Sequence, residues 1–173
     1  ETAEMIKYAA NVMLATKISF ANAIAQLSEL TGADGLKVLE GIGLDKRIGS
    51  SFLSPGAGYG GSCFPKDVKA LIKIASNAGY DFSLLSDVEK INKDATLGIV
   101  KKANKLLGEN LKDKTIGILG LSFKPDTDDM RDAPSVIIIN HLLQKGAKIK
   151  VYDPIGLTWV QVLNILYVTT TII

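Results

Sequence analysis

The stretch from residue 3 to residue 30 constrains the fold most, because it holds no proline and no glycine. Its apolar residues recur at helical spacing and form a broad stripe of Ile6, Ala9, Ala10, Met13, Leu14, Ile18, Ala21, Ala25 and Leu27. A helix over this stretch is about 42 Å long, which exceeds what a small domain needs. The stretch predicts a core helix, and its length favours a helix that also packs against its copy in a second subunit.

Shorter helices follow, and the pattern then changes. Asp34 can cap a helix that runs to about Gly43, and further helices are predicted over residues 65–78 and 83–107, with Gly79 ending the first of these. After residue 114 the order becomes strand, helix and strand, over residues 115–120, 134–145 and 148–154. The first strand is apolar enough to be a buried parallel strand, and the order predicts a βαβ unit of the doubly wound type.

The predicted fold is therefore mostly α. An all-helical dimerisation and active-site domain spans residues 1–110, and a truncated α/β Rossmann-like domain spans residues 111–173. The tail from 155 onward does not extend the pattern, although residues 168–173 have high β propensity. Two strands and one helix do not form a stable open sheet alone, and the chain starts inside a helical pattern, so we expect a fragment.

Composition limits the chemistry. The net charge of +2 gives no indication of nucleic acid or of an anionic membrane as a partner. One cysteine, Cys63, excludes an internal disulfide and a cysteine-based zinc site, and the single histidine, His141, leaves little for a transition metal. No signal peptide is visible, and no apolar run approaches the roughly 18 residues of a membrane span. We expect a cytoplasmic protein without a metal.

The segment around Cys63, residues 58–67 (GYGGSCFPKD), carries the strongest chemical signal. Its glycines allow positive φ and close approach of a ligand, and Pro65 suits the first turn of a helix. Cys63 is therefore predicted at a helix N-terminus, where the helix dipole and Lys66 favour the nucleophilic thiolate. The alternative is that Cys63 is a small buried hydrophobic residue.

This segment closely resembles the active-site cysteine loop of the UDP-glucose 6-dehydrogenases, within the wider nucleotide-sugar dehydrogenase family. Residues 4–11 (EMIKYAAN) resemble the family's central helix, and residues 121–135 (LSFKPDTDDMRDAPS) give a second specific match. The resemblance covers residues 1 to about 154. Within the family, the cysteine segment is more similar to the UDP-glucose enzymes than to the GDP-mannose or N-acetylmannosamine enzymes.

The resemblance implies a role for each matched residue. The catalytic residues would be Cys63, Lys7, Asn11 and Asp67, with Lys7 stabilising a developing negative charge and Asp67 positioning the hydrolytic water. The sugar nucleotide would contact Arg47 of the neighbouring subunit, Phe52, the backbone of Ser54, Gly58, Tyr59 and Gly60, and then Phe123 and Lys124. Lys66 and Arg131 would lie on the cofactor side. Without the resemblance, all of these except Cys63 read as ordinary surface, loop or helix-end residues.

By the same resemblance, the whole enzyme oxidises the C6 alcohol of a UDP-sugar to a carboxylate with two NAD+, through a thiohemiacetal and a thioester on Cys63. The family's N-terminal NAD domain has no match in this sequence, so the chain alone is expected to be inactive and to dimerise through its first helix. A GDP-mannose or other nucleotide-sugar dehydrogenase and a non-catalytic dimerisation module are the alternatives. A cysteine hydrolase is disfavoured, because His141 lies in a distant helix.

Overall fold

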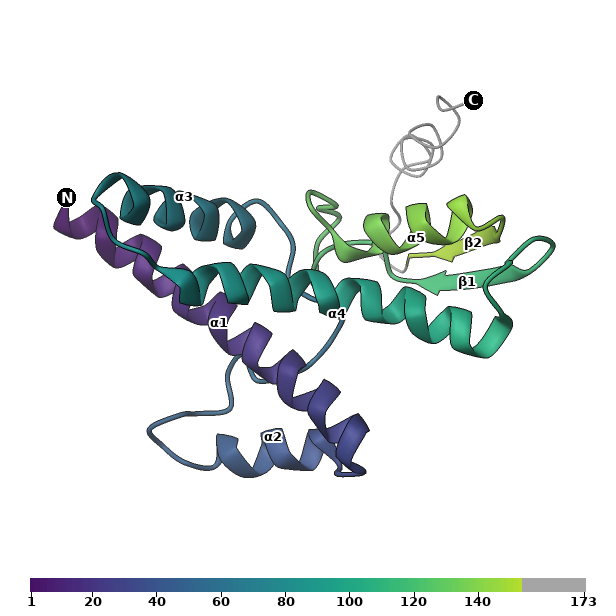
Figure 1. The fold of residues 1–173 in the computed structure, drawn as a ribbon, viewed down its shortest axis with the longest axis horizontal. Helices are drawn as coiled ribbons and strands as arrows, with labels where there is room; N and C mark the ends of the chain where they lie inside the picture. The colour runs from purple at the N-terminus through teal and green to yellow at the C-terminus, as the bar shows by residue number, and fades with distance from the viewer. Residues whose placement is uncertain (154–173) are drawn as a thin grey trace. The chain divides into compact units, whose positions relative to one another are not determined.

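The computed structural model describes residues 1–153. Its elements are α1 (Thr2–Thr31), α2 (Gly35–Gly43), α3 (Phe64–Asn77), α4 (Ser83–Leu107), β1 (Thr115–Leu119), α5 (Pro134–Gln144) and β2 (Lys148–Tyr152) (Figure 1). The chain forms two compact units that divide between Ala95 and Thr96, inside α4. The described part is mostly helical with a small parallel sheet, and the predictions for residues 155–173 lie outside it.

Local signals in the sequence account for the helix ends. Gly32 ends α1 in the left-handed region at φ +78°, and its N–H donates to the Ser28 carbonyl. Asp34 caps α2 as predicted, because its Oδ1 accepts from the N–H groups of Leu36 and Lys37 at 3.1 and 3.2 Å. α3 begins and ends one residue earlier than the sequence predicts, with Pro65 in its first turn.

The first helix has two different faces. One face is buried and packs into the core of the first unit through Val12 and Ala15. Helices α2 and α3 both contact α1, with α3 beside its N-terminal half and α2 beside its C-terminal half (Figure 1). On another face every seventh residue is apolar and exposed: Ile6 at 65%, Met13 at 60%, Phe20 at 48% and Leu27 at 55%. We call these four residues the α1 stripe.

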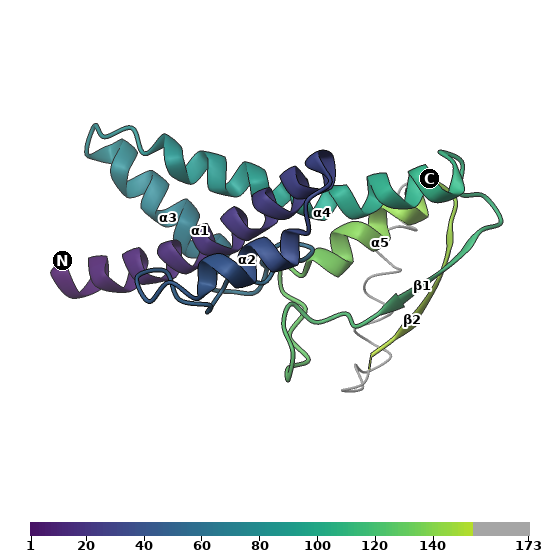
Figure 2. The same cartoon turned by 90° about the horizontal axis from the view of Figure 1, so that it is seen from below.

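The second unit contains the predicted βαβ arrangement. Strands β1 and β2 are parallel and in register from Thr115 opposite Lys148 to Leu119 opposite Tyr152, and α5 connects them. Figure 2 shows α5 along the strands, and apolar residues fill the space between them: Ile118, Leu121, Val136, Ile139, Leu143, Ile149 and Val151.

One expectation for β1 is wrong. The sequence predicts a strand buried on both faces, but burial alternates along β1 and Leu119 is 85% exposed. The reason is that α5 lies on one face of the sheet, and no other element among residues 1–153 covers the opposite face. Strand β2 alternates in the same way.

Candidate active site

Asp67 is the centre of a polar cluster that joins α1 to α3. Its side chain is fully buried in the first turn of α3. Oδ2 accepts hydrogen bonds from Lys7 Nζ at 2.7 Å and Asn11 Nδ2 at 2.6 Å, and Oδ1 accepts one from Lys66 Nζ at 2.9 Å. Lys7 and Asn11 are four residues apart, so one face of α1 presents both. The structure thus brings the predicted catalytic residues Lys7, Asn11 and Asp67 together. We call these three residues and Lys66 the Asp67 cluster.

The donors in this cluster control its charge. Burial by itself raises the pKa of a carboxyl group, but the hydrogen bonds from Lys7, Lys66 and Asn11 outweigh burial and lower the pKa of Asp67 to about 2. The hydrogen bond to Asp67 in turn raises the pKa of Lys66. At neutral pH, Asp67 is therefore an ionised counter-charge that fixes the positions of its donors, and it is a weak base.

Cys63 lies where the sequence predicts, at the N-cap of α3. Its side chain is exposed, so it is not the buried structural cysteine of the alternative interpretation. The Sγ atom lies 3.8 Å from Ser62 Oγ, and the Cys63 carbonyl accepts the Asp67 N–H at 2.9 Å. A substrate carbonyl can therefore reach the thiol from solvent, one helical turn from the Asp67 cluster.

The loop before Cys63 has the backbone that its glycines make possible. Gly58 and Gly61 take φ values of +102° and +80°, which a side chain would strain. Between them, the Tyr59 side chain is buried in the core, where burial and the hydrogen bond to Glu89 raise the pKa of Tyr59. The Tyr59 ring is thus part of the core and is not available to a ligand.

Phe52 is the predicted substrate residue with the most unusual backbone. It is exposed and takes φ +64°, a left-handed conformation that costs about 1–3 kcal/mol for a residue other than glycine. Its ring packs edge-on against Phe64, the first residue of α3, with the ring centroids 6.2 Å apart. Such strain is concentrated at functional sites, and the role of Phe52 in binding the substrate stays a prediction.

Arg47 and Arg131 share one geometry. In each case the aspartate two residues earlier accepts the arginine backbone N–H at 2.9 Å and lies 2.6 Å from Nη2. Each arginine also donates through Nε: Arg47 Nε lies 3.0 Å from Asp45 Oδ1, and Arg131 Nε lies 2.9 Å from Asp129 Oδ1. These contacts lower the pKa of both aspartates, and that of Asp129 falls to about 2. We call each pair an Asp-x-Arg clamp.

In the second unit, the predicted ligand residues lie in the loop after β1. Lys124 Nζ lies 5.5 Å from the centre of the Phe123 ring, and the Phe123 N–H donates to the Asp129 carbonyl at 3.0 Å. The start of the loop is tied to the end of β2, because the Leu121 N–H donates to Asp153 Oδ2 at 2.8 Å. This edge, where parallel strands end, is where ligands bind in α/β sheets.

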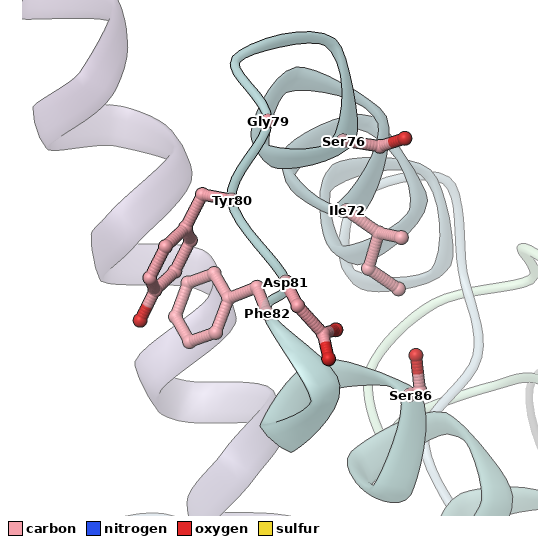
Figure 3. A pocket seen from close by; sticks show the side chains of 7 residues that line it. All are labelled: Ile72, Ser76, Gly79, Tyr80, Asp81, Phe82 and Ser86. Atoms are coloured by element: carbon pink, nitrogen blue, oxygen red, sulfur yellow. The ribbon is translucent and has the colours of Figure 1, made fainter.

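The first unit also has a pocket between the end of α3 and the start of α4 (Figure 3). Its lining includes Ile72, Ser76, Gly79, Tyr80, Asp81, Phe82 and Ser86. Tyr80 and Phe82 form an edge-on ring pair, with their centroids 5.6 Å apart. None of the predicted catalytic, substrate-binding or cofactor-binding residues lines this pocket.

Sequence reasoning missed the residues that support the site. Asn22 and Asn92 hold the backbone of the glycine loop, and Asp45 and Asp129 hold the two arginines. The aspartates carry a detectable signal, the repeated spacing Asp-x-Arg. The asparagines carry none, because their partners are more than thirty residues away.

Residues 1–153 contain neither a candidate metal site nor a candidate membrane-spanning helix. No group of three or more His, Cys, Asp and Glu side chains in this part of the chain could hold a metal ion. No described helix combines the length and the apolar character that crossing a membrane requires.

Comparison with known proteins gives two family matches. Residues 1–94 match the central domain of the UDP-glucose/GDP-mannose dehydrogenase family, and residues 117–169 match the UDP binding domain of the same family. Among curated proteins, the chain is 55% identical over 157 residues to UDP-glucose 6-dehydrogenase YwqF of Bacillus subtilis. It is 51% identical over 156 residues to UDP-glucose 6-dehydrogenase of Rickettsia bellii.

Solved structures give the same result. A UDP-glucose dehydrogenase from Pyrobaculum islandicum superposes with a TM-score of 0.85 at 42% identity, over 88% of this chain and 35% of that one. A UDP-D-ManNAc dehydrogenase from Pyrococcus horikoshii gives 0.76 at 29% identity, over 88% of this chain and 36% of that one. The two curated matches cover 91% and 90% of this chain, which spans 36% of the length of each of those relatives.

Proposed function

Because the chain belongs to the UDP-glucose/GDP-mannose dehydrogenase family, we propose that it supplies part of the active site of an enzyme that oxidises UDP-glucose to UDP-glucuronate. The observation that carries this proposal is the Asp67 cluster beside the exposed thiol of Cys63. The names of the curated relatives favour UDP-glucose. A GDP-mannose or other nucleotide-sugar dehydrogenase is the second candidate, because the family includes such enzymes.

Cys63 is the nucleophile in this proposal. The C6 alcohol first loses a hydride from C6 and its hydroxyl proton to become an aldehyde. The sulfur of Cys63 then forms a bond to the aldehyde carbon, and the carbonyl oxygen takes a proton to give a thiohemiacetal. Loss of a hydride from C6 and of the hydroxyl proton leaves a thioester. Water then adds to the thioester carbon, and the C–S bond breaks to release the carboxylate and the free thiol. The exposed side chain of Cys63 allows this attack.

Lys7 and Asn11 stabilise the oxygen at C6 in this scheme. An ammonium and an amide N–H₂ beside that oxygen favour the negative charge that develops in each addition step. Asp67 keeps both groups in place, since it is buried, ionised and hydrogen-bonded to each. We also assign to Asp67 the placement of the hydrolytic water, through its contacts with these donors.

Two further groups of residues bind the ligands. The UDP-sugar would be held by the backbone of residues 54–60, by Phe52, Phe123 and Lys124, and by Arg47 from the neighbouring subunit. The glycine N–H groups and the cationic side chains suit its pyrophosphate. Lys66 and Arg131, exposed cationic side chains that each pair with an aspartate, would lie on the NAD+ side of the site. When bound, NAD+ accepts the hydride that each of the two oxidations releases.

We further propose a cytoplasmic homodimer that forms through the α1 stripe. Four apolar side chains at seven-residue spacing form a continuous surface of the kind that copies of a helix bury against each other. The reducing cytoplasm would keep the single cysteine in its thiol form, which a nucleophile requires. Residues 1–110 would form the dimerisation and active-site domain, and residues 111–173 part of the UDP-sugar domain.

The test is an activity assay on the protein that the native gene encodes. We expect two NADH per UDP-glucose consumed, and no UDP-glucuronate from Cys63→Ala. The neighbouring variant Ser62→Ala, which removes a hydroxyl 3.8 Å from the thiol, serves as the matched control and keeps activity. If Cys63→Ala still forms UDP-glucuronate, Cys63 is not the nucleophile. If the protein oxidises GDP-mannose and not UDP-glucose, the substrate is GDP-mannose.

The 173 residues by themselves are expected to give no NADH. They span about a third of the length of the relatives, and we expect the rest of the site to lie outside them. Activity of the isolated chain would favour a complete site within it. If the native gene product dimerises but oxidises no nucleotide sugar, the chain is better explained as a non-catalytic dimerisation module than as part of an enzyme.

A further inference from the structure

The glycine loop is held by side chains that have no part in the proposed chemistry. Asn92, on α4, pairs with both backbone groups of Tyr59. The Tyr59 N–H donates to Asn92 Oδ1 at 2.7 Å, and Asn92 Nδ2 donates to the Tyr59 carbonyl at 3.1 Å. A single carboxamide thus makes the two hydrogen bonds that a neighbouring strand would make, and it fixes the peptide planes on both sides of Tyr59.

Two more side chains hold the same loop. The Tyr59 hydroxyl donates to Glu89 Oε1 at 2.5 Å, and Glu89 lies three residues before Asn92, on the same side of α4. From α1, the buried side chain of Asn22 accepts the Gly56 N–H through Oδ1 at 2.7 Å. The loop is therefore connected to two helices of the first unit at positions three residues apart.

Such anchoring matters because of the composition of the loop. The segment contains four glycines, which lose more freedom on ordering than any other residue: Gly56, Gly58, Gly60 and Gly61. If the loop were mobile, a ligand that bound its backbone would have to order it, and the entropy cost of this ordering would weaken the binding affinity. Anchors made during folding remove that loss.

We propose that Asn92, with Asn22, is a positioning residue for the nucleotide sugar, holding residues 56–61 in the ligand-binding arrangement before the ligand arrives. This inference rests on the proposed function, in which the loop lines the nucleotide-sugar site. Neither asparagine needs to touch the reacting atoms, because each acts through the backbone that it holds.

The kinetic test uses Asn92→Ala in the protein that the native gene encodes. We expect the KM for UDP-glucose to rise about tenfold with kcat unchanged, since ordering even one residue costs about that factor in affinity. A role in stability alone would lower the folded fraction, and therefore the apparent kcat, without moving KM.

Ser19→Ala is the matched control. Ser19 is fully buried, and its hydroxyl donates to the Val88 carbonyl at 2.9 Å, so it also joins α1 to α4, one turn from Asn92. This variant loses a buried hydrogen bond but leaves the loop anchors intact, so its KM is expected to stay unchanged. An unchanged KM in a folded Asn92→Ala protein would overturn the proposal, as would an equal rise of KM in both variants.

Amide hydrogen exchange by NMR tests the anchoring without turnover. In the unaltered protein without ligand, the Gly56 and Tyr59 amides are expected to exchange slowly, because both N–H groups are bound. Exchange at the rate of an unstructured peptide would overturn the inference even if no variant folds. Slow exchange in a protein that neither binds nor oxidises UDP-glucose would instead refute the proposed function and leave the anchoring in place.

Discussion

At the scale of single residues, Asp67 shows that hydrogen bonds can outweigh burial. A carboxyl group with no exposed surface ordinarily becomes harder to ionise, yet three donors keep this one charged. In the proposed mechanism, Cys63 and Asp67 therefore have different roles. Cys63 supplies the reactive atom, whereas Asp67 supplies a fixed negative charge around which Lys7 and Asn11 are arranged.

This charge predicts how stability depends on pH. The folded pKa of Asp67, about 2, lies below its ordinary value of 3.8, so its ionisation stabilises the fold fully above about pH 4 to 5. That contribution is lost as pH falls through 4 toward 2, because the unfolded chain binds the proton first. In urea unfolding, the stability difference between the unaltered protein and Asp67→Asn should shrink over this range. A difference that stays constant from pH 6 to pH 2 would contradict the assignment.

At the scale of elements, the α1 stripe predicts the oligomeric state. Replacing Phe20, in the middle of the stripe, with lysine would place a charge in an apolar interface, so Phe20→Lys is expected to give a monomer by light scattering at micromolar concentration. The control Gln26→Lys changes an exposed residue of α1 outside the stripe and should stay dimeric. A monomeric unaltered protein would remove the proposed dimer, and a dimeric Phe20→Lys would place its interface elsewhere.

The elements also show what a sequence can predict. The helices and both strands follow from local signals, such as Asp34 before α2 and Pro65 in the first turn of α3. Burial on both faces of β1 could not be read from its composition, because an apolar run does not reveal how many neighbours will cover it. The contacts of Asn22 and Asn92 with the glycine loop were also missed. The pattern of residues along a helix does not reveal which distant backbone group a polar side chain will bind, as Asn92 binds that of Tyr59.

At the scale of the whole molecule, stability is expected to differ between the two units. Up to residue 153, the second unit has a two-stranded sheet with one face covered by α5, an arrangement that is marginal without further layers. Native-state hydrogen exchange of the 173-residue chain should therefore show lower protection in β1 and β2 than in α1 and α3.

Two core substitutions provide the internal comparison for that measurement. Val12→Ala in the first unit and Ile139→Ala in the second each remove buried apolar groups, at a cost of about 1–4 kcal/mol. Each should lower protection mainly in its own unit. Equal loss of protection throughout the chain from either variant would mean that the two units unfold as one.

The Asp-x-Arg clamps have a consequence for how charged ligands reach the protein. Each arginine comes with its own negative partner two residues away, and the net charge of the whole chain is only +2. At these two arginines, an approaching pyrophosphate therefore meets nearly neutral pairs, whose attraction fades at short range even in dilute buffer. Salt should then change little of what the two clamps contribute to the association rate of a ligand. Their discrimination among anions depends instead on the direction in which each guanidinium points.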